Sequence, residues 1–298
     1  MEDIEKKLKE QLEIYFNKKL QNFETTDFSK GCDNLVYLIK TKEESLIIRF
    51  PKKLKSERPS SHSPLHLQWC IEKCSKSKVK VPKKLFANET VYIEEYITGN
   101  DLSDVSKELK KSEILKIYQQ IGTELKKIHS IKTKKFSYMS EIPGIGSRSN
   151  FYQHFEKDLI ENATSVFKKN PEILNEIQLE LISNLLEKYK NYLIGLSDPR
   201  LLHCDITNNN IRVEKLNDEF ELKSIIDFSD CCSGDPLYDF GEIFEECGCD
   251  WEYISSLEIG YGKKFDSFEK EIIVFYGLSY AIWLEHKENL HYCLNYLK

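Results

Sequence analysis

The stretch "LLHCDITNNN", residues 201–210, decides how the rest of the chain is interpreted. It places a histidine, an aspartate and three consecutive asparagines directly after two leucines, and asparagine runs favour neither helices nor strands. Two strand-like segments follow, "NIRVE" at 210–214 and "LKSIIDF" at 222–228, separated by a turn. The sequence therefore predicts a polar loop that feeds one strand of a hairpin, with Asp227 at the end of the other strand.

This hairpin should bring Asn210 and Asp227 close together in space. One amide oxygen and one carboxylate, completed by phosphate oxygens and waters, form a suitable ligand set for Mg²⁺. Asp205 lies earlier on the same loop, where it can face the metal site and orient a hydroxyl nucleophile. A loop held between rigid elements is a common place for catalytic side chains.

Length and composition limit the remaining possibilities. The 298 residues, 40% of them hydrophobic, can bury one large core or two moderate ones. No apolar run is long enough to cross a membrane, and the charged start "MEDIEKKLKE" is unlike a secretory signal, so we expect a cytoplasmic protein. Nine cysteines without a CxxC pair favour reduced thiols over disulfides or a zinc site.

The net charge of −6 argues against nucleic acid as a partner, because phosphate binding normally needs a basic surface. The charge is unevenly distributed, since residues 224–262 contain no lysine or arginine. This segment is rich in carboxylates, which indicates either a wall for a cationic partner or, for its outer members, a solvated helix face. The carboxylates that we assign to a substrate wall are Asp230, Asp235, Glu242, Glu245, Glu246 and Asp250.

The order of predicted elements divides the chain into two parts. Residues 1–97 contain an amphipathic helix and several strands, including a predicted hairpin formed by "NLVYLIK" and "SLIIRF". Residues 98–298 are dominated by helical patterns, apart from the hairpin described above, and "SYMSEIPGIGSRSN" at 137–150 is predicted to be a loop. We predict an α+β protein with a small β-rich lobe and a larger helical lobe.

A family resemblance adds to this interpretation. The pattern HxDxxxxN at 203–210, the strand ending in "IIDF" and the later "GDPLYDFGEIF" resemble the aminoglycoside phosphotransferase and choline kinase superfamily. The likeness covers nearly the whole chain in order and implies a protein-kinase-like two-lobed fold. The other matching segments are "FSKGCDNLVYLI", "LIIRFPKK", "KVPKKLFA", "VYIEEYITGNDL" and "IGTELKKIHSI".

The resemblance implies a role for each matching residue. Asp205 would be the catalytic aspartate, and Asn210 and Asp227 would hold Mg²⁺. His203 and Asp239 would be structural residues that brace the catalytic loop. The nucleotide, ATP or GTP, would be bound at the phosphate loop by Gly31 and Asn34, on the third strand by Arg49, and at the hinge by Glu95, Tyr96 and Ile97.

Two departures from the kinase pattern concern the third strand. Kinases carry a lysine there, whereas this chain has Arg49, whose guanidinium can also clasp phosphate oxygens. The glutamate expected on the following helix is missing between Ser63 and Gln68, and Glu72 lies about one turn later. The ion-pair partner of Arg49 is therefore left unassigned.

The acidic segment favours a polycationic acceptor, and the resemblance points to an aminoglycoside antibiotic, with the branch that acts on the 2″-hydroxyl as the most similar. Such an enzyme would confer resistance to the antibiotic. We expect a monomer whose partner is a cationic small molecule. Two alternatives remain open: a metabolic kinase of the choline or amino-sugar type, which would need an aromatic cage, and a catalytically silent kinase-like binding protein.

Overall fold

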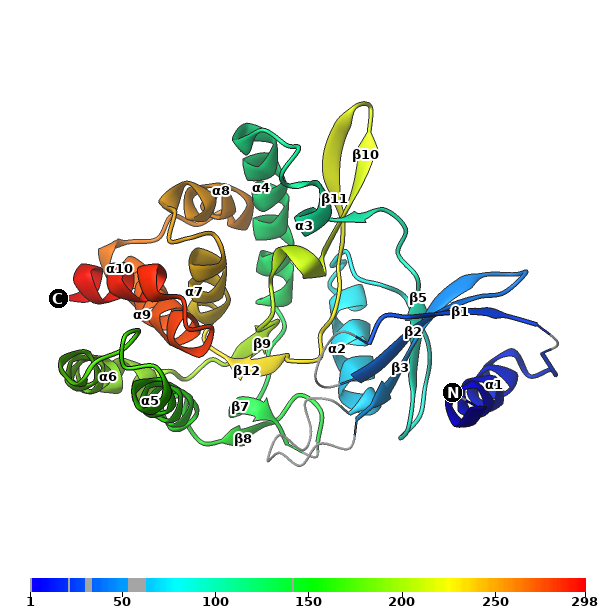
Figure 1. The fold of residues 1–298 in the computed structure, drawn as a ribbon, viewed down its shortest axis with the longest axis horizontal. Coiled ribbons are helices and arrows are strands. Elements are labelled where there is room, and N and C mark those ends of the chain that lie inside the picture. Colours follow the sequence, from blue (N-terminus) through cyan, green and yellow to red (C-terminus); the bar gives the residue numbers. More distant parts are fainter. Residues whose placement is uncertain (1, 21, 30–33, 53–62, 141) are drawn as a thin grey trace.

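The computed structural model describes residues 2–20, 22–29, 34–52, 63–140 and 142–298 of the chain. A small lobe built on an antiparallel sheet is joined to a larger lobe made mostly of helices, and the termini lie at opposite ends of the molecule (Figure 1). The sequence predicts this division. The boundary that we place between residues 97 and 98 falls in a linker without regular structure, residues 96–99.

The sheet of the small lobe has the strand order β1-β2-β3-β5-β4. The predicted hairpin is present, because β2 and β3 pair along their whole lengths, from Asn34 opposite Pro51 to Lys40 opposite Ser45. The strands are β1 (Glu24–Asp27), β2 (Asn34–Lys40), β3 (Ser45–Pro51), β4 (Lys84–Ala87) and β5 (Tyr92–Glu95).

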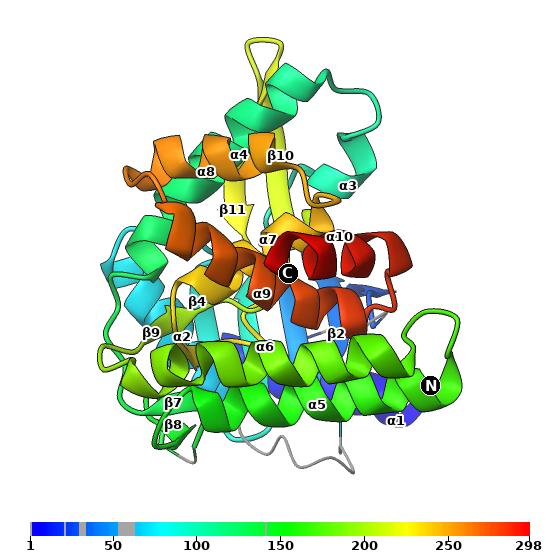
Figure 2. The same cartoon turned by 90° about the vertical axis from the view of Figure 1, so that its left-hand side faces the viewer.

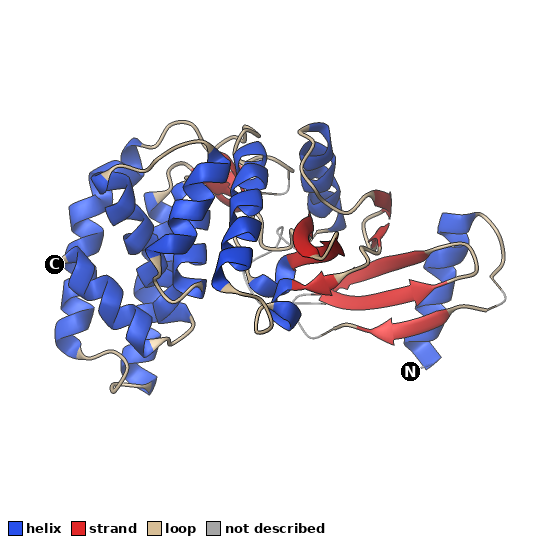
Figure 3. Ribbon diagram, turned by 90° about the horizontal axis from the view of Figure 1, so that it is seen from above, coloured by secondary structure: helices blue, strands red, loops and turns tan. Residues whose placement is uncertain are grey.

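Alternation along β3 gives the sheet two different faces. Leu46, Ile48 and Phe50 are fully buried in a core shared with helix α1 (Glu2–Phe16), which covers the outer face (Figure 3). Ile47 and Arg49 point to the opposite face and line the pocket between the lobes. Helix α2 (Pro64–Lys76) packs on this inner side, against β3, β4 and β5. The two-residue period thus aims Arg49 at the helical lobe.

The helical lobe is held by one continuous core. Its helices are amphipathic: in α4, Ile117, Ile121, Leu125 and Ile128 are fully buried at intervals of three or four residues. Helices α5 and α6 run side by side (Figure 2). The helices are α3 (Leu102–Val105), α4 (Lys111–Ile128), α5 (Tyr152–Lys169), α6 (Glu176–Gly195), α7 (Leu237–Glu246), α8 (Trp251–Tyr261), α9 (Ser267–Trp283) and α10 (Lys287–Leu297).

Short strands complete this lobe. The hairpin β10–β11 closes through a two-residue turn in which Asn217 (φ 49°) and Asp218 (φ 68°) both have positive φ, as tight hairpin turns require. The short 3₁₀ helix η1 (Asn208–Asn210) leads directly into β10. The strands are β6 (Asn100–Asp101), β7 (Phe136–Met139), β8 (Gly146–Arg148), β9 (Arg200–Leu202), β10 (Ile211–Leu216), β11 (Glu219–Ile225) and β12 (Cys232–Gly234).

One expectation about local structure is wrong. The segment 137–150, predicted as a loop, contains most of β7 and all of β8, which pair with each other, and β7 also pairs with β12. Its glycines and proline hid two strands that pair with each other, and the second partner of β7, strand β12, comes from a distant part of the chain. The eight described cysteines are free thiols. In the described part of the chain, the helices are too short or too polar to cross a bilayer.

Helices α4 and α8 cross unusually closely, which gives a stability prediction. A Cβ added at Gly260 would lie 1.7 Å from the carbonyl oxygen of Gln119, a backbone atom that cannot move aside cheaply. We expect Gly260→Ala to lower the free energy of unfolding by about 1–3 kcal/mol or more, measured by urea denaturation. The control is Gly195→Ala near the end of α6, where the added methyl meets nothing within 4 Å. Equal stability of the two variants would contradict this account.

Candidate active site

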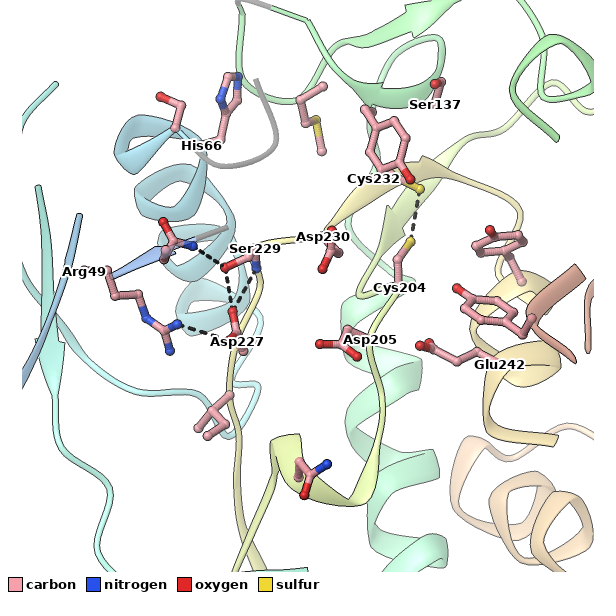
Figure 4. A pocket seen from close by; sticks show the side chains of 18 of the residues that line it. Arg49, His66, Ser137, Cys204, Asp205, Asp227, Ser229, Asp230, Cys232 and Glu242 are labelled. Carbon is pink, nitrogen blue, oxygen red and sulfur yellow. Dashed lines mark hydrogen bonds and ion pairs between the residues drawn. The ribbon is translucent and has the colours of Figure 1, made fainter. Parts of the chain in front are cut away.

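Residues from both lobes line one large pocket between them (Figure 4). The small lobe contributes Asn34 and Arg49 from its sheet, and the helical lobe contributes the predicted catalytic loop and the segment that follows β11. Asp205 and Asp227 both line this pocket. The structure thus places residues that lie far apart in sequence around one shared space.

The predicted catalytic loop, residues 203–210, holds Asp205 by short hydrogen bonds. The side-chain amide of Asn210 donates to the carboxylate of Asp205 at 2.6 Å and to its backbone carbonyl at 2.9 Å. Burial raises the pKa of Asp205 to about 7, and the neighbouring carboxylates of Asp227 and Asp230 act in the same direction. A carboxylate held in this environment is a stronger base than an exposed aspartate.

His203 occupies the interior behind this loop and is completely buried. Burial lowers the pKa of His203, so the ring is neutral at pH 7. Its Nε2 lies 3.1 Å from the carbonyl oxygen of Ile226, and its Nδ1 accepts from the backbone N–H of Asp205 at 3.2 Å. These contacts connect the loop to the strand end before Asp227. They fit a structural residue better than a base that faces substrate.

Asp239, at the start of α7, contacts the same loop from the other side. Its carboxylate accepts from the backbone N–H groups of His203 at 3.0 Å and Cys204 at 2.9 Å, and it lies 2.9 Å from Nε2 of His129. Cys204 has a φ of 60°, an uncommon conformation for a residue with a side chain. The contacts of Asp239 help to hold this turn, directly before Asp205, in place.

Two more carboxylates on the same face of α7 continue this support. Glu242 accepts from the backbone N–H of Ile206 at 3.1 Å, and Glu246 accepts from that of Asn208 at 3.4 Å. Their spacing from Asp239, three and then four residues, is the spacing of one helix face. This face of α7 therefore holds successive backbone amides of the catalytic loop.

Asp227 lies opposite Asp205 and is bound from two sides. One carboxylate oxygen accepts from the hydroxyl of Ser229 at 2.6 Å, and the other accepts from the Arg49 guanidinium at 3.1 Å. Burial alone would raise the pKa of Asp227, but Arg49 and Ser229 outweigh it and hold the pKa below its usual range. Asn34 in turn donates to the Ser229 hydroxyl at 3.1 Å. Asp227 is therefore ionised and linked to the small lobe.

Arg49 has an ion-pair partner that the sequence did not reveal. Its Nε donates to Glu94 on β5 at 2.9 Å, and both side chains are over 90% buried. The expected glutamate on α2 is thus replaced by one on a neighbouring strand. Burial would lower the pKa of Arg49, but Asp227 and Glu94 raise it, so the guanidinium stays charged. Glu94 lies on the inner face of the sheet, a position that the alternation in "VYIEEYI" could have indicated.

The predicted nucleotide-binding residues lie along the small-lobe side of the pocket. Asn34 lines it, as do the linker residues Glu95, Tyr96 and Ile97. The side-chain carbonyl oxygen of Asn34 is buried and has no hydrogen-bond partner among the described residues, so it is available to a bound group. Gly31 lies outside the described residues.

The predicted acidic wall is only partly at the pocket. Asp230 and Glu242 line it, and Asp230 lies beside Asp205 in Figure 4. Asp235 is instead buried and accepts from the hydroxyls of Tyr192 and Tyr276, which connects the segment before α7 to α6 and α9. We therefore remove Asp235 from the substrate site, because two tyrosine hydroxyls already occupy the carboxylate.

Three further carboxylates of the predicted wall also lie elsewhere. Glu245 is buried and bound to Nδ1 of His286, on the side of α7 away from the catalytic loop. Asp250 caps α8 and pairs with Lys111 at 2.7 Å on the surface. Glu246 lies behind the catalytic loop, beside a separate small cavity. These three carboxylates are close to Asp227 in sequence, but they do not line the pocket.

The structure adds two carboxylates that the sequence analysis missed. Asp158 and Glu161 on α5 line the helical-lobe side of the pocket. Their spacing of three residues puts them on one helix face, but the sequence of α5 contains other charged residues that lie outside the pocket. Only the packing of α5 shows which of its charged residues line the pocket and which do not.

Comparison with known proteins agrees with this geometry. Residues 24–261 match the model of the phosphotransferase enzyme family. The chain belongs to this family. No curated protein sequence matched the chain in a separate search.

Solved structures related to this phosphotransferase share its fold over nearly the whole chain. The streptomycin–ATP–APH(2″)-IIa ternary complex is 23% identical, with a TM-score of 0.61 over 98% of this chain and 95% of the other. ADP-bound APH(2″)-Ib is 24% identical, with a TM-score of 0.61 over 97% and 95%. A putative fructosamine-3-kinase from Thermobifida fusca is 12% identical, with a TM-score of 0.64 over 97% and 96%. The predicted kinase-like two-lobed fold is confirmed.

The donor atoms of the phosphotransferase fit a hard divalent cation. Asn210 uses its amide nitrogen on Asp205, which leaves its amide oxygen for another partner. The backbone carbonyl of Asn210 accepts from the N–H of Ile226 at 2.9 Å, which places Asn210 beside the residue before Asp227 at the base of the hairpin. Carboxylate and amide oxygens suit Mg²⁺, which usually takes its remaining ligands from phosphates and water.

Proposed function

We propose that this phosphotransferase moves the γ-phosphoryl group of ATP or GTP to a hydroxyl of a cationic small molecule, with an aminoglycoside as the acceptor class. The observation that carries the proposal is the arrangement of Asp205 and Asp227 around one pocket. Asp205, a carboxylate with a raised pKa, lies on the loop held by α7. Asp227 is linked to a buried arginine of the opposite lobe.

Each side of the pocket supplies a different part of the reaction. Arg49 and the buried amide of Asn34 lie where donor phosphates would be bound. Asn210 and Asp227 would hold Mg²⁺, which neutralises phosphate charge when bound. Asp205 would orient the acceptor hydroxyl and receive its proton. Phosphoryl transfer depends mainly on such alignment and charge stabilisation.

The acceptor side carries a surplus of negative charge. Asp158, Glu161 and Asp230 line it together with Asp205, and these carboxylates outnumber the neighbouring cations Arg148 and Lys157. Glu242 lines it too, but burial raises the pKa of this carboxyl well above its ordinary value, so it adds little charge. Several carboxylates around an open cavity attract a ligand that carries several ammonium groups. This arrangement supports an aminoglycoside. Asp230 and Glu242 remain from the wall that we predicted, and Asp158 and Glu161 on α5 take the place of its other members.

A second candidate is a metabolic kinase that acts on a single amine or an amino sugar. Tyr238, Tyr280 and Trp283 line the same side of the pocket, so aromatic faces are available to an organic cation. The structural likeness to a putative fructosamine-3-kinase is compatible with this alternative. A third possibility is a kinase-like protein that binds nucleotide without transferring phosphate.

One assay separates the three candidates. Release of nucleoside diphosphate is measured with Mg²⁺ and either ATP or GTP, in the presence of kanamycin-class and gentamicin-class aminoglycosides, choline or an amino sugar. Aminoglycoside-dependent release supports the main proposal, and release with choline or an amino sugar supports the metabolic kinase. Nucleotide binding without release under any of these conditions favours the silent protein and overturns the proposed transfer.

Charge removal on α5 tests the acceptor side. We expect the double variant Asp158→Asn, Glu161→Gln to raise the KM for an aminoglycoside about two- to fivefold, because partly exposed ion pairs contribute only modestly. The KM for the nucleotide should stay unchanged. The matched control is Glu156→Gln, an exposed carboxylate on the same helix that does not line the pocket. Equal effects of the double variant and the control would remove α5 from the acceptor site.

A further inference from the structure

One arginine of the helical lobe is bound to the linker between the lobes. The guanidinium of Arg212, on β10, donates to the backbone carbonyls of Ile97 at 3.0 Å and Gly99 at 2.6 Å. It also pairs with the carboxylate of Asp101 at 2.5 Å. The side chain is only 12% exposed. Arg212 therefore binds two residues of the linker, Ile97 and Gly99, and one residue of the strand that follows, Asp101.

The backbone brings these groups together. Strand β6, directly after the linker, pairs with β10, with Asp101 opposite Arg212 and Asn100 opposite Val213. Gly99 has a φ of 113°, and a Cβ at this position would lie 2.4 Å from the carbonyl oxygen of Val213. Only glycine allows so close an approach in this conformation. The linker is thus packed directly onto the hairpin.

The proposed metal ligands lie at the base of the same hairpin, one next to each strand. Asn210 directly precedes β10, which begins at Ile211, and Asp227 lies two residues after β11 ends at Ile225. Arg212 is two residues from Asn210. A shift of the hairpin relative to the linker would therefore move the metal ligands relative to the groups expected to contact the nucleobase.

Arg212 also faces the pocket itself. Arg212, Asp101, Tyr96 and Ile97 all line it, beside Ile47 and Ile226 from the two lobes. Asp101 balances the charge of Arg212, and two backbone carbonyls accept its N–H groups. These contacts hold the side chain in one orientation at the pocket wall. Its Nε is buried and has no partner among the described residues.

We propose that Arg212 is a positioning residue for the nucleotide: it keeps the linker at a fixed distance from the hairpin, so that the base site and the metal site match one donor molecule. The proposal rests on the proposed function, because it assumes that a nucleotide occupies the small-lobe side of the pocket. It adds a requirement beyond the motif residues His203, Asp205, Asn210 and Asp227, namely a guanidinium that binds the linker backbone.

The test compares Arg212→Ala with Arg200→Ala. Arg200 is a matched control, since its guanidinium also contacts a carboxylate, Asp198, and two backbone carbonyls, those of His129 and Ser130, but it does not line the pocket. The dissociation constant of Mg-ATP and Mg-GTP is measured by direct titration, and the unfolding midpoint in urea is measured for the same samples. Steady-state kinetics then separate KM for the nucleotide from KM for the acceptor.

We expect Arg212→Ala to weaken nucleotide binding about tenfold or more and to raise the KM for the nucleotide in parallel, with the KM for the acceptor within about twofold of wild type. Arg212→Lys keeps the charge toward Asp101 but cannot bind both carbonyls as a fork, so its affinity should be intermediate. Arg200→Ala should leave nucleotide affinity unchanged. If Arg212→Ala does not fold, Arg212→Lys serves as the test variant.

The outcomes distinguish this inference from the proposed function. Wild-type nucleotide affinity that persists in Arg212→Ala and Arg212→Lys overturns the role of Arg212 alone. A lower unfolding midpoint without a change in nucleotide affinity also overturns it, because it shows a purely structural role. If the wild-type chain binds neither Mg-ATP nor Mg-GTP, the proposed function fails first, and the inference fails with it.

Discussion

Replacing Asp205 by asparagine should lower the rate of phosphoryl transfer by about 10²–10⁴-fold while the affinity for nucleotide remains close to that of wild type. The substitution keeps the size of the side chain but removes the group that can accept a proton from the acceptor hydroxyl. The pKa of Asp205, raised to about 7 by burial and by the nearby carboxylates, suits such a base. The loss should appear in kcat, because the carboxylate acts mainly in the transition state.

The measurement is nucleoside diphosphate release with the best acceptor, combined with direct titration of Mg-nucleotide. Asp218→Asn is the control, since it removes a carboxylate from the exposed hairpin tip, far along the strands from Asn210. It should have wild-type kinetics. Near-normal turnover by Asp205→Asn would refute the catalytic role. Loss of nucleotide binding together with turnover would instead show that the loop had collapsed.

The catalytic loop and its hairpin were predictable because their signals are local. The spacing of His203, Asp205 and Asn210 is read along the chain, and the asparagine and aspartate at the hairpin turn tolerate positive φ. Strand-like apolar runs likewise located the hairpin formed by β2 and β3. Each of these features depends on residues that are close together in sequence.

The ion-pair partner of Arg49 and the acceptor wall depended on tertiary packing. Glu94 meets Arg49 only because β5 lies beside β3 in the sheet, an order that reverses the sequence order of β4 and β5. Asp158 and Glu161 reach the pocket only because α5 packs along it. A sequence contains the residues of such contacts but not the arrangement of the elements that brings them together.

Helix α7 shows how charge clustering misled the prediction. Its carboxylates were interpreted as one wall, but the helix distributes them around its axis. Asp239, Glu242 and Glu246 face the catalytic loop and accept its backbone N–H groups, whereas Glu245 faces α10 and is bound to His286 and Asn289. Most of the negative charge in this segment therefore supports the structure of the site, and only a small part of it reaches the pocket.

Asp239 should be among the most sensitive positions in the helical lobe. We expect Asp239→Ala to lower the free energy of unfolding by about 3–5 kcal/mol, because it leaves the backbone N–H groups of His203 and Cys204 and the ring of His129 buried without an acceptor. Denaturation in urea measures the change. Asp250→Ala is the control: this residue caps α8 on the surface, and its loss should cost only about 1 kcal/mol. Similar losses for the two variants would contradict the bracing role.

The same carboxylate should make the protein sensitive to acid. Burial alone would raise the pKa of Asp239, but the hydrogen bonds from His129 and from the two backbone N–H groups outweigh it and lower the pKa below the ordinary value. A group with a lowered native pKa contributes its full stabilisation above the unfolded pKa, about 3.9 for aspartate, and loses it as the pH falls toward the native pKa. Asp239→Asn has no carboxylate to protonate there. The difference in unfolding free energy between wild type and Asp239→Asn should therefore be constant from neutral pH to about pH 5 and shrink below about pH 4, whereas a difference that stays constant throughout would show that Asp239 is not ionised in the native protein.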